Sequence, residues 1–281
     1  MTTVPQTVER REAGRVRSMV DIYLTTARMA IASEFQYRTG HYFFLLGMIA
    51  EPVIYLVVWS TVAVQQGGEV GGFTPNEFAA YYIVWTLVRN MNVASVGAWE
   101  GHIREGDLSR MLLHPIHPVH WDIGYFAGWK LVVIVMWLPV AVVLSLLFRP
   151  MFSVEPIDVA VFGVAIWGAY AVRSLLYSNV GMAAFWTTRM GPILQVVMIF
   201  ELLFSGRLVP LSLMPDWAQR LADVLPFKWT FGFPIEALIG GLPVAALLGG
   251  LAMQALWIVI GVIAIRLIWP FAVRRYAAVG G

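Results

Sequence analysis

Cysteine is absent from the 281-residue sequence, and charged residues make up only 13% of it. The first absence excludes disulfides, thiol nucleophiles and cysteine-ligated metal sites. A soluble globular domain carries about 25% charged residues, so the second absence indicates that lipid surrounds most of the surface. With 59% hydrophobic residues, the chain has room for about six membrane-spanning helices and modest loops. A soluble catalytic domain does not fit beside them.

Several functional signatures are also missing. The chain has no glycine-rich phosphate-binding loop ending in Gly-Lys-Ser/Thr, so we expect no nucleotide site in it. The zinc-protease pattern HExxH and the nucleophile elbow Gly-x-Ser-x-Gly are absent, which disfavours an enzyme. The net charge of +2 comes from dispersed residues, so no nucleic-acid partner is expected. The first forty residues do not resemble a cleaved signal peptide, and the N-terminus is expected to stay on the protein.

The apolar stretches predict an all-α integral membrane protein, with residues 1–281 forming a single transmembrane domain. Residues 18–38 have helical spacing of apolar side chains and predict an amphipathic helix at the membrane interface. No Gly-x-x-x-Gly stripe dominates any span. The six predicted spans are residues 42–64, 76–99, 123–148, 158–185, 191–205 and 245–269.

Residues 206–241 are dense in prolines and aromatic residues and predict a re-entrant or surface-lying hairpin. Asp216 is a suitable N-cap for a short amphipathic helix that ends at Leu225. Pro234 is suited to open a second helix, closed by Gly240 and Gly241. Irregular backbone at membrane depth must be covered by protein or water, so we expect this segment to cap a pathway or a subunit seam.

Basic residues near the spans predict the orientation. The loop after the first span carries none, and the loop after the second carries Arg104 and Arg110, which places both termini in the cytoplasm. The external segment holds Arg207, Arg220 and Lys228, which a longer translocated segment tolerates. Six basic residues precede the first span: Arg10, Arg11, Arg15, Arg17, Arg28 and Arg38.

Four charged residues lie well inside predicted spans, where an unpaired charge costs several kcal/mol. Counted from the span ends, their depths predict the pairs Glu51 with Arg89 and Arg173 with Glu201. These pairs are either structural salt bridges or part of the substrate path, and the sequence favours neither. Three polar residues are expected to complete the network: Asn90, Asn179 and Gln195.

The loop between the second and third spans is the longest polar stretch predicted inside the cell. Leu108, Met111 and Leu112 have helical spacing, and Pro115 ends the pattern, which suits a short helix in a groove on a soluble partner. His114, His117 and His120 follow at every third residue. Three imidazoles could bind zinc, but the intervening prolines prevent a shared helical face, so no metal site is expected.

Two sequence patterns carry a resemblance to a known family. The first runs from Glu105-Gly106-Asp107-Leu108 through Leu113-His114-Pro115. The second is Ser205-Gly206-Arg207-Leu208-Val209-Pro210-Leu211, followed by Met214-Pro215-Asp216-Trp217 and Leu225-Pro226-Phe227. Together with the order of the apolar stretches, they resemble the permeases of type-2 ABC exporters over nearly the whole chain.

This resemblance implies a dimer of six-span permeases, identical or paralogous, in membrane lipid. Each permease would lean on a separate cytoplasmic ATPase that binds ATP and magnesium, and this chain would need no cofactor or metal of its own. Residues 18–38 would be the interface helix. The loop at residues 100–115 resembles the coupling helix, with Arg104, Glu105, Gly106, Asp107, Leu108, Met111, Leu112 and Pro115. Residues 206–241 would form the external gate, with Pro210, Pro215, Trp217, Pro226, Phe227 and Trp229.

The predicted function is therefore ATP-driven export of an amphipathic substrate, such as a drug or lipid, across the cytoplasmic (inner) membrane of a bacterium. An alternative is an autonomous ion- or proton-coupled carrier that titrates Glu51 and Glu201. The lack of an internal repeat speaks against that carrier, since many carriers consist of duplicated halves. An intramembrane enzyme is a third hypothesis, but the charges lie too deep and too far apart to favour it.

Overall fold

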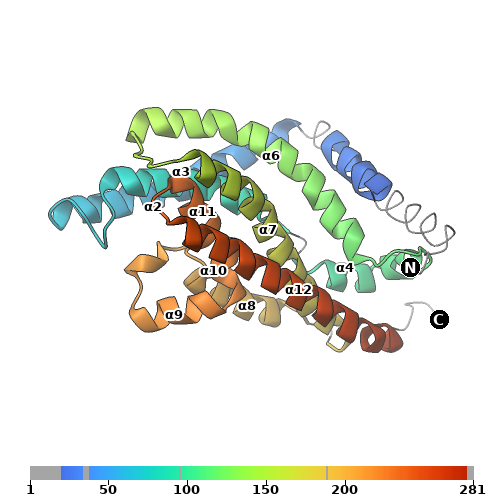
Figure 1. The fold of residues 1–281 in the computed structure, drawn as a ribbon. Helices are drawn as coiled ribbons and strands as arrows, with labels where there is room; N and C mark the ends of the chain where they lie inside the picture. The colour runs from blue at the N-terminus through green and yellow to red at the C-terminus, as the bar shows by residue number, and fades with distance from the viewer. Residues whose placement is uncertain (1–19, 34–37, 95, 188, 277–281) are drawn as a thin grey trace, which may run out of the picture.

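The computed structural model describes residues 20–33, 38–94, 96–187 and 189–276 (Figure 1). Helices make up most of these residues, and apart from two isolated bridges the described part of the chain contains no β-structure. The prediction of an all-α protein is confirmed. The parts of the predicted N-terminal region outside the described residues are residues 18–19 and 34–37 of the interface helix, and Arg10, Arg11, Arg15 and Arg17.

Three helices among the described residues are long and apolar enough to cross a bilayer. They are α6 (Val119–Phe148), α7 (Pro156–Gly181) with its 3-10 extension η1 (Met182–Phe185), and α12 (Val244–Arg275). At the other three predicted spans lie α2 (Arg38–Gln65), α3 (Pro75–Met91) and α8 (Gly191–Phe204). Because α8 is shorter than a full crossing, the count of six spans stays a prediction.

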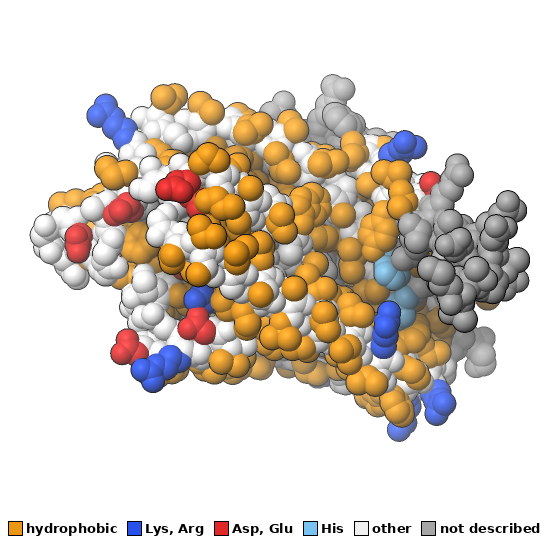
Figure 2. Space-filling model, in the orientation of Figure 1, with side chains coloured by type: hydrophobic (Ala, Val, Ile, Leu, Met, Phe, Trp, Pro, Cys, Tyr) orange, Lys and Arg blue, Asp and Glu red, His pale blue; other side chains and the backbone are white. Residues whose placement is uncertain are grey.

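The core of the protein surrounds α3, which is buried along almost its whole length. It packs against α2, α6 and α11 (Gly232–Ile239). Most of the apolar surface of α6 and α12 is exposed instead, and Figure 2 shows hydrophobic side chains over the middle of the molecule with charged groups toward its ends. This distribution is the one expected of helices in contact with lipid. The aromatic core around α3 comprises Phe78, Tyr81, Tyr82 and Trp85, with Tyr55 and Trp59 of α2.

Local sequence explains where α3 begins. Thr74 and Glu77 form a capping box, in which the Thr74 N–H donates to Glu77 Oε2 at 2.7 Å and the Glu77 N–H donates to Thr74 Oγ1 at 3.4 Å. Pro75 occupies the first turn, where a missing N–H costs nothing.

The end of α3 differs from the prediction. The helix ends at Met91, whereas the predicted second span ran to residue 99. Residues 98–104 form a separate helix, α4 (Ala98–Arg104), which begins after Gly97 in the left-handed conformation at φ +79°. The break is possible because side chains of neighbouring helices bind the freed carbonyl groups, as the site below shows. The other long helices differ less: α6 begins at Val119 rather than Ile123, and α12 continues to Arg275.

Residues 20–33 form a helix that packs on α6, where Tyr23 and Thr26 lie beside Gly124 and Ala27 lies beside Gly128. Leu24 is 51% exposed, whereas Thr26 is buried. Gly124 and Gly128 of α6 allow the close approach, since a Cβ on Gly128 would lie 2.3 Å from the Cα of Ala27. This Gly-x-x-x-Gly pair serves packing within the chain.

Residues 206–241 fold into four short helices. Two of them lie where short helices were predicted: α9 (Asp216–Val224), in which Asp216 is the first helical residue and Pro215 takes the predicted N-cap position, and α11, which is closed by Gly240 with φ +88°. Two were not predicted, the 3-10 helix η2 (Leu211–Leu213) and α10 (Pro226–Thr230).

The two ends of the molecule carry different elements. α4, α5 (Asp107–Met111) and the C-terminal end of α12 lie at one end, at the right of Figure 1. Ser109 Oγ and Tyr276 OH are 2.7 Å apart there. α9 and the loop between α2 and α3 lie at the other end. The long helices therefore separate the predicted cytoplasmic loop from the predicted external segment.

We predict that Gly250→Ala lowers the stability of the protein by about 1–3 kcal/mol, because overpacking strains a filled interface. A Cβ at this position of α12 would lie 2.0 Å from the ring of Phe233 in α11. Gly249→Ala is the matched control, since nothing lies within 4 Å of its Cβ position. Thermal unfolding in detergent compares the two variants, and equal melting temperatures would contradict the close contact between α11 and α12.

Candidate functional site

A polar cluster surrounds the C-terminal end of α3. The carbonyl oxygen of Asn92 accepts a hydrogen bond from Arg173 Nη1 of α7 at 2.6 Å, and the carbonyl oxygen of Val93 accepts one from Lys130 Nζ of α6. The Asn92 side chain donates to the carbonyl oxygen of Thr230 in α10. The last carbonyls of a helix carry partial negative charge and lack intrahelical donors, so two cations are favourable partners for them.

Arg173 is also paired with Glu201 of α8, as the sequence predicted. Arg173 Nε lies 2.6 Å from Glu201 Oε1, and Nη2 lies 3.2 Å from Oε2. The two side chains are 9% and 2% exposed. Tyr177 donates its hydroxyl proton to Glu201 Oε2, and the Arg173 guanidinium lies over the Tyr177 ring. This bidentate, enclosed geometry compensates both buried charges.

Lys130 is a buried charge that the sequence analysis missed. Its side chain is fully buried in α6, and its ammonium lies 4.7–5.9 Å from three ring centroids. Aromatic faces and one carbonyl thus surround the cation, which stabilises it by cation–π attraction. Its position in the middle of a long apolar stretch would have been enough to predict a buried charge. The three rings belong to Phe126, Trp129 and Tyr170.

The second predicted pair joins α2 and α3. Arg89 Nη2 lies 2.7 Å from Glu51 Oε2, and Arg207 Nη2 lies 3.7 Å from Glu51 Oε1. The pairing is confirmed, and Arg207 extends it to three charges, which the sequence analysis did not foresee. The guanidinium of Arg89 also lies 5.6 Å from the ring centroid of Trp85. Unlike the Arg173 pair, these side chains are 23–31% exposed.

The predicted polar network around the pairs is wrong in its members. Asn90 donates to the carbonyl oxygen of Thr86 within its own helix. Asn179 donates to the carbonyl oxygens of Leu175 and Gly261, which joins α7 to α12. Gln195 is exposed on α8. Residues that are close to the charged residues in sequence lie on other faces of their helices and do not meet the ion pairs. The prediction was wrong because it relied on proximity in sequence.

The loop at residues 100–115 folds as α4 and α5, and the structure corrects the role expected of Leu108. Leu108 is 0% exposed and packs with Trp99, Met182 and Ile265, so it is unavailable to a partner. Met111 packs at the edge of the same cluster. The exposed apolar groups are Leu112 (36% exposed) and Leu113 (86% exposed). Exposed polar and proline residues beside them are Arg104, Glu105, Arg110 and Pro115.

Two further contacts fasten this loop to the long helices. His102 Nε2 lies 3.2 Å from Asp122 Oδ1 of α6, and this hydrogen bond raises the pKa of His102. Ser109 Oγ meets Tyr276 OH after the end of α12. Asp107 Oδ1 accepts from Arg110 Nη2 at 3.1 Å within α5, and Gly106 has φ +80° at the corner between the two short helices.

The three histidines do not converge. His120 Nδ1 lies 2.9 Å from Tyr23 OH, His114 packs near Trp121, and the centroid of the His117 ring lies 4.2 Å from that of Trp269. Among the described residues, no group of three potential metal ligands occurs.

The start of the segment at residues 206–241 is hydrogen-bonded to side chains of α3. Tyr81 OH donates to the carbonyl oxygen of Gly206 at 2.7 Å, Trp85 Nε1 to that of Arg207 at 2.8 Å, and Tyr82 OH to that of Leu208 at 3.3 Å. Three donors from one face of one helix therefore fix the start of the segment. Of the predicted gate residues, Pro210, Pro226, Phe227 and Trp229 are buried, whereas Pro215 and Trp217 are exposed.

The family model for the ABC-2 family transporter protein matches residues 49–280, which is most of the chain. The chain belongs to the ABC-2 transporter family. This ABC-2 family member is thus a multi-pass membrane protein and the permease component of a transporter, in a family that in general has an ABC ATPase as its partner. None of the curated proteins matches the chain.

We predict that Glu201→Gln destabilises this ABC-2 family member by about 3–5 kcal/mol, because it leaves the buried Arg173 charge uncompensated. The double variant Arg173→Met with Glu201→Met removes both charges and is expected to regain most of the loss. The fraction of monodisperse protein after heating in detergent measures both effects. If Glu201→Gln is as stable as the parent, the stability of the protein does not depend on this ion pair.

A second prediction concerns pH. Burial, with a smaller effect of His120, lowers the pKa of His117 from 6.5 to about 4. Its Nδ1 accepts a hydrogen bond from the Val119 N–H at 3.3 Å, and its Nε2 is buried without a partner, so the folded protein disfavours the cation. The unfolded chain binds more protons than the folded one between pH 6.5 and 4, and stability falls as the pH falls through that window.

His117→Phe should therefore show a smaller loss of thermal stability between pH 7 and 4 than the parent protein. His114→Gln, at an exposed position of the same loop, should retain the parent's dependence. The same dependence in all three proteins would rule out His117 as its source.

Proposed function

We propose that this chain is the permease subunit of an ATP-driven exporter that moves an amphipathic substrate, such as a drug or lipid, outward across the bacterial cytoplasmic membrane. It works with a second permease, identical or paralogous, and with separate ATPase subunits that bind ATP and magnesium. Membership of the ABC-2 family supports the transporter role. The resemblance of its motifs to those of type-2 exporters supports the outward direction.

The observation that carries the coupling role is the way α4 and α5 are held. Leu108 is anchored in a core cluster with residues of α7 and α12, while Leu113, which follows α5, is 86% exposed. Arg104, Glu105 and Arg110 are exposed around it. An exposed apolar anchor with a charged rim suits a groove on a soluble ATPase. Because the loop is fastened, a displacement of the ATPase would be passed to the long helices.

The cluster of Glu51, Arg89 and Arg207 supports a second permease or a hydrated pathway. These side chains, from α2, α3 and the start of the 206–241 segment, are 23–31% exposed. A charged group that faces hydrocarbon is costly, whereas one that faces a cavity or a protein partner is not. We therefore assign this surface to the substrate path or to the seam with the second permease.

The segment at residues 206–241 is the external gate in this proposal. It lies at the opposite end from α4 and α5. With the coupling loop in the cytoplasm the segment would be outside, and the basic residues before the first span support cytoplasmic termini. Its short helices leave backbone that needs cover, and α3 provides that cover by the hydrogen bonds from Tyr81, Tyr82 and Trp85.

The rival proposal of an autonomous carrier finds less support. Both glutamates that it would titrate are held by arginines, Glu51 at 2.7 Å and Glu201 at 2.6 Å. Glu201 also accepts a hydrogen bond from Tyr177, and both Arg173 and Tyr177 beside it are buried.

The test is Leu113→Asp in the tagged full-length chain, purified in mild detergent from its native membrane. If α5 docks on an ATPase, recovery of that ATPase and of ATP hydrolysis should fall by about tenfold or more, the cost of losing an interface anchor. Mass spectrometry identifies what is recovered and reveals a second permease.

Val224→Asp is the matched control, since Val224 is an exposed apolar residue (67%) of α9 at the opposite end. It should leave ATPase recovery unchanged. Equal recovery from Leu113→Asp and the parent chain would refute docking through this loop, and recovery of the parent chain alone would refute the ATPase partnership.

A further inference from the structure

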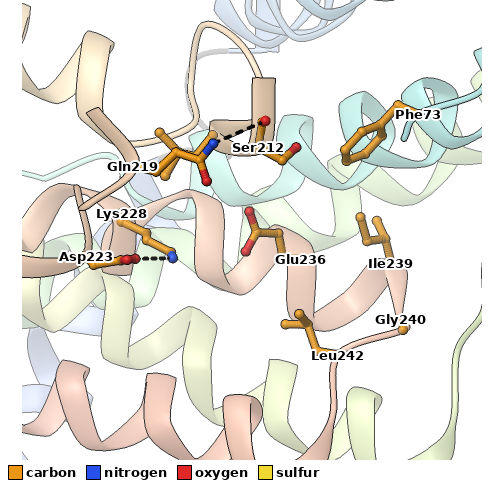
Figure 3. Close-up of a pocket in the computed structure, with 11 residues that line it drawn as sticks. Phe73, Ser212, Gln219, Asp223, Lys228, Glu236, Ile239, Gly240 and Leu242 are labelled. Carbon is orange, nitrogen blue, oxygen red and sulfur yellow. Dashed lines mark hydrogen bonds and ion pairs between the residues drawn. The ribbon is translucent and has the colours of Figure 1, made fainter. Parts of the chain in front are cut away.

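A pocket of about 360 Å³ opens between η2, α9, α10 and α11, at the end opposite to α4 and α5 (Figure 3). Its size is within the range that holds a small organic molecule or a headgroup. Phe73, at the start of α3, and Leu242 provide apolar walls, while Gln219 and Glu236 provide polar ones. One side of the pocket therefore suits an aliphatic group and the other a polar group.

The charges of the lining do not cancel. Lys228 Nζ lies 2.5 Å from Asp223 Oδ1, so these two side chains neutralise each other. In the part of the chain that the structure describes, the Glu236 carboxylate has neither an ion pair nor a hydrogen bond, and Figure 3 shows it projecting between the Lys228 pair and Ser212. Among the described residues of the lining, Glu236 is thus the acidic side chain without a counter-ion.

Two polar side chains of the lining, Gln219 and Glu236, offer hydrogen-bond acceptors to the pocket. The amide nitrogen of Gln219 is occupied by the carbonyl oxygens of Ser212 at 3.3 Å and Met214 at 2.7 Å. Its amide oxygen is thus left to accept, beside the Glu236 carboxylate. An ammonium group has three donors and no acceptor, which matches this lining, whereas an anion would meet the Glu236 charge and an occupied lysine.

We propose that this pocket binds the ammonium group of an amphipathic amine, with the Glu236 carboxylate as its counter-ion and the apolar walls around its aliphatic part. The amine is either the headgroup of a membrane lipid or a free small molecule. The site works in the permease alone, so it does not depend on the proposed coupling to an ATPase.

The pH dependence of amine binding provides a second test of the role of Glu236. Burial, opposed by the charge of Lys228 and assisted by that of Asp223, raises the pKa of Glu236 to about 7. Tyr81 of α3 is a further titratable group near it. The carboxylate is therefore largely neutral at pH 6 and ionised at pH 8, while an alkylamine stays protonated over this range because its pKa is about 10. Amine binding should tighten as the pH rises from 6 to 8.

The experiment uses the full-length chain in a maltoside detergent, which carries no amine, and titrates it with hexylamine by calorimetry. Glu236→Gln keeps the shape of the side chain and should weaken hexylamine binding by about tenfold or more. Glu69→Gln, at an exposed carboxylate of the α2–α3 loop, should bind as the parent does. Leu242→Trp fills the pocket and should abolish binding without touching a charge.

Native mass spectrometry with equal amounts of phosphatidylethanolamine and phosphatidylglycerol distinguishes the two sources of the amine. Retention of phosphatidylethanolamine that is lost in Glu236→Gln assigns a lipid headgroup, and hexylamine binding without lipid retention assigns a free amine. Unchanged hexylamine binding in Glu236→Gln or in Leu242→Trp would overturn the proposal. Hexanol that binds as tightly as hexylamine would overturn it as well.

Discussion

The interrupted C-terminal end of α3 is the constraint on which the rest of the structure depends. A helix that ends inside a membrane protein leaves carbonyl groups that need donors. Arg173 and Lys130 supply them to Asn92 and Val93. Arg173 is itself a buried charge and needs Glu201 beside it, which fixes α8 against α7. One break in one helix thus determines how four helices are arranged, and the Asn92 side chain adds α10 to them.

The sequence predicted the ion pairs because the cost of an isolated charge in a membrane is large and its depth can be counted along an apolar stretch. It did not predict the carbonyl partners of Arg173, because a backbone acceptor leaves no trace in the residue types. Lys130 was within reach of the same rule. Arg207 was not, since it lies outside any apolar stretch and meets Glu51 only through the folding of residues 206–208 back onto α3.

Helical spacing was similarly informative up to a limit. It identified the apolar face of α5, but not whether that face would meet a partner or the chain's own core, and Leu108 turned out to meet the core. It identified a helix at residues 20–33, while the choice of packed face followed from the room that Gly124 and Gly128 leave on α6. In both places the missing information is tertiary: the spacing defines a surface, and the neighbour decides how the surface is used.

The arrangement also limits how the molecule can change shape. Moving α3 away from α6 and α7 would expose Lys130 and separate the Arg173 cluster, and moving it away from residues 206–208 would break three hydrogen bonds. These elements are therefore expected to move together. The ion pairs of Glu51 with Arg89 and Arg207 are different. Their charges are partly exposed, so water can replace the protein partner at a small cost in free energy. A rearrangement is easiest where α2 meets this body, which is also where the surface is least suited to lipid.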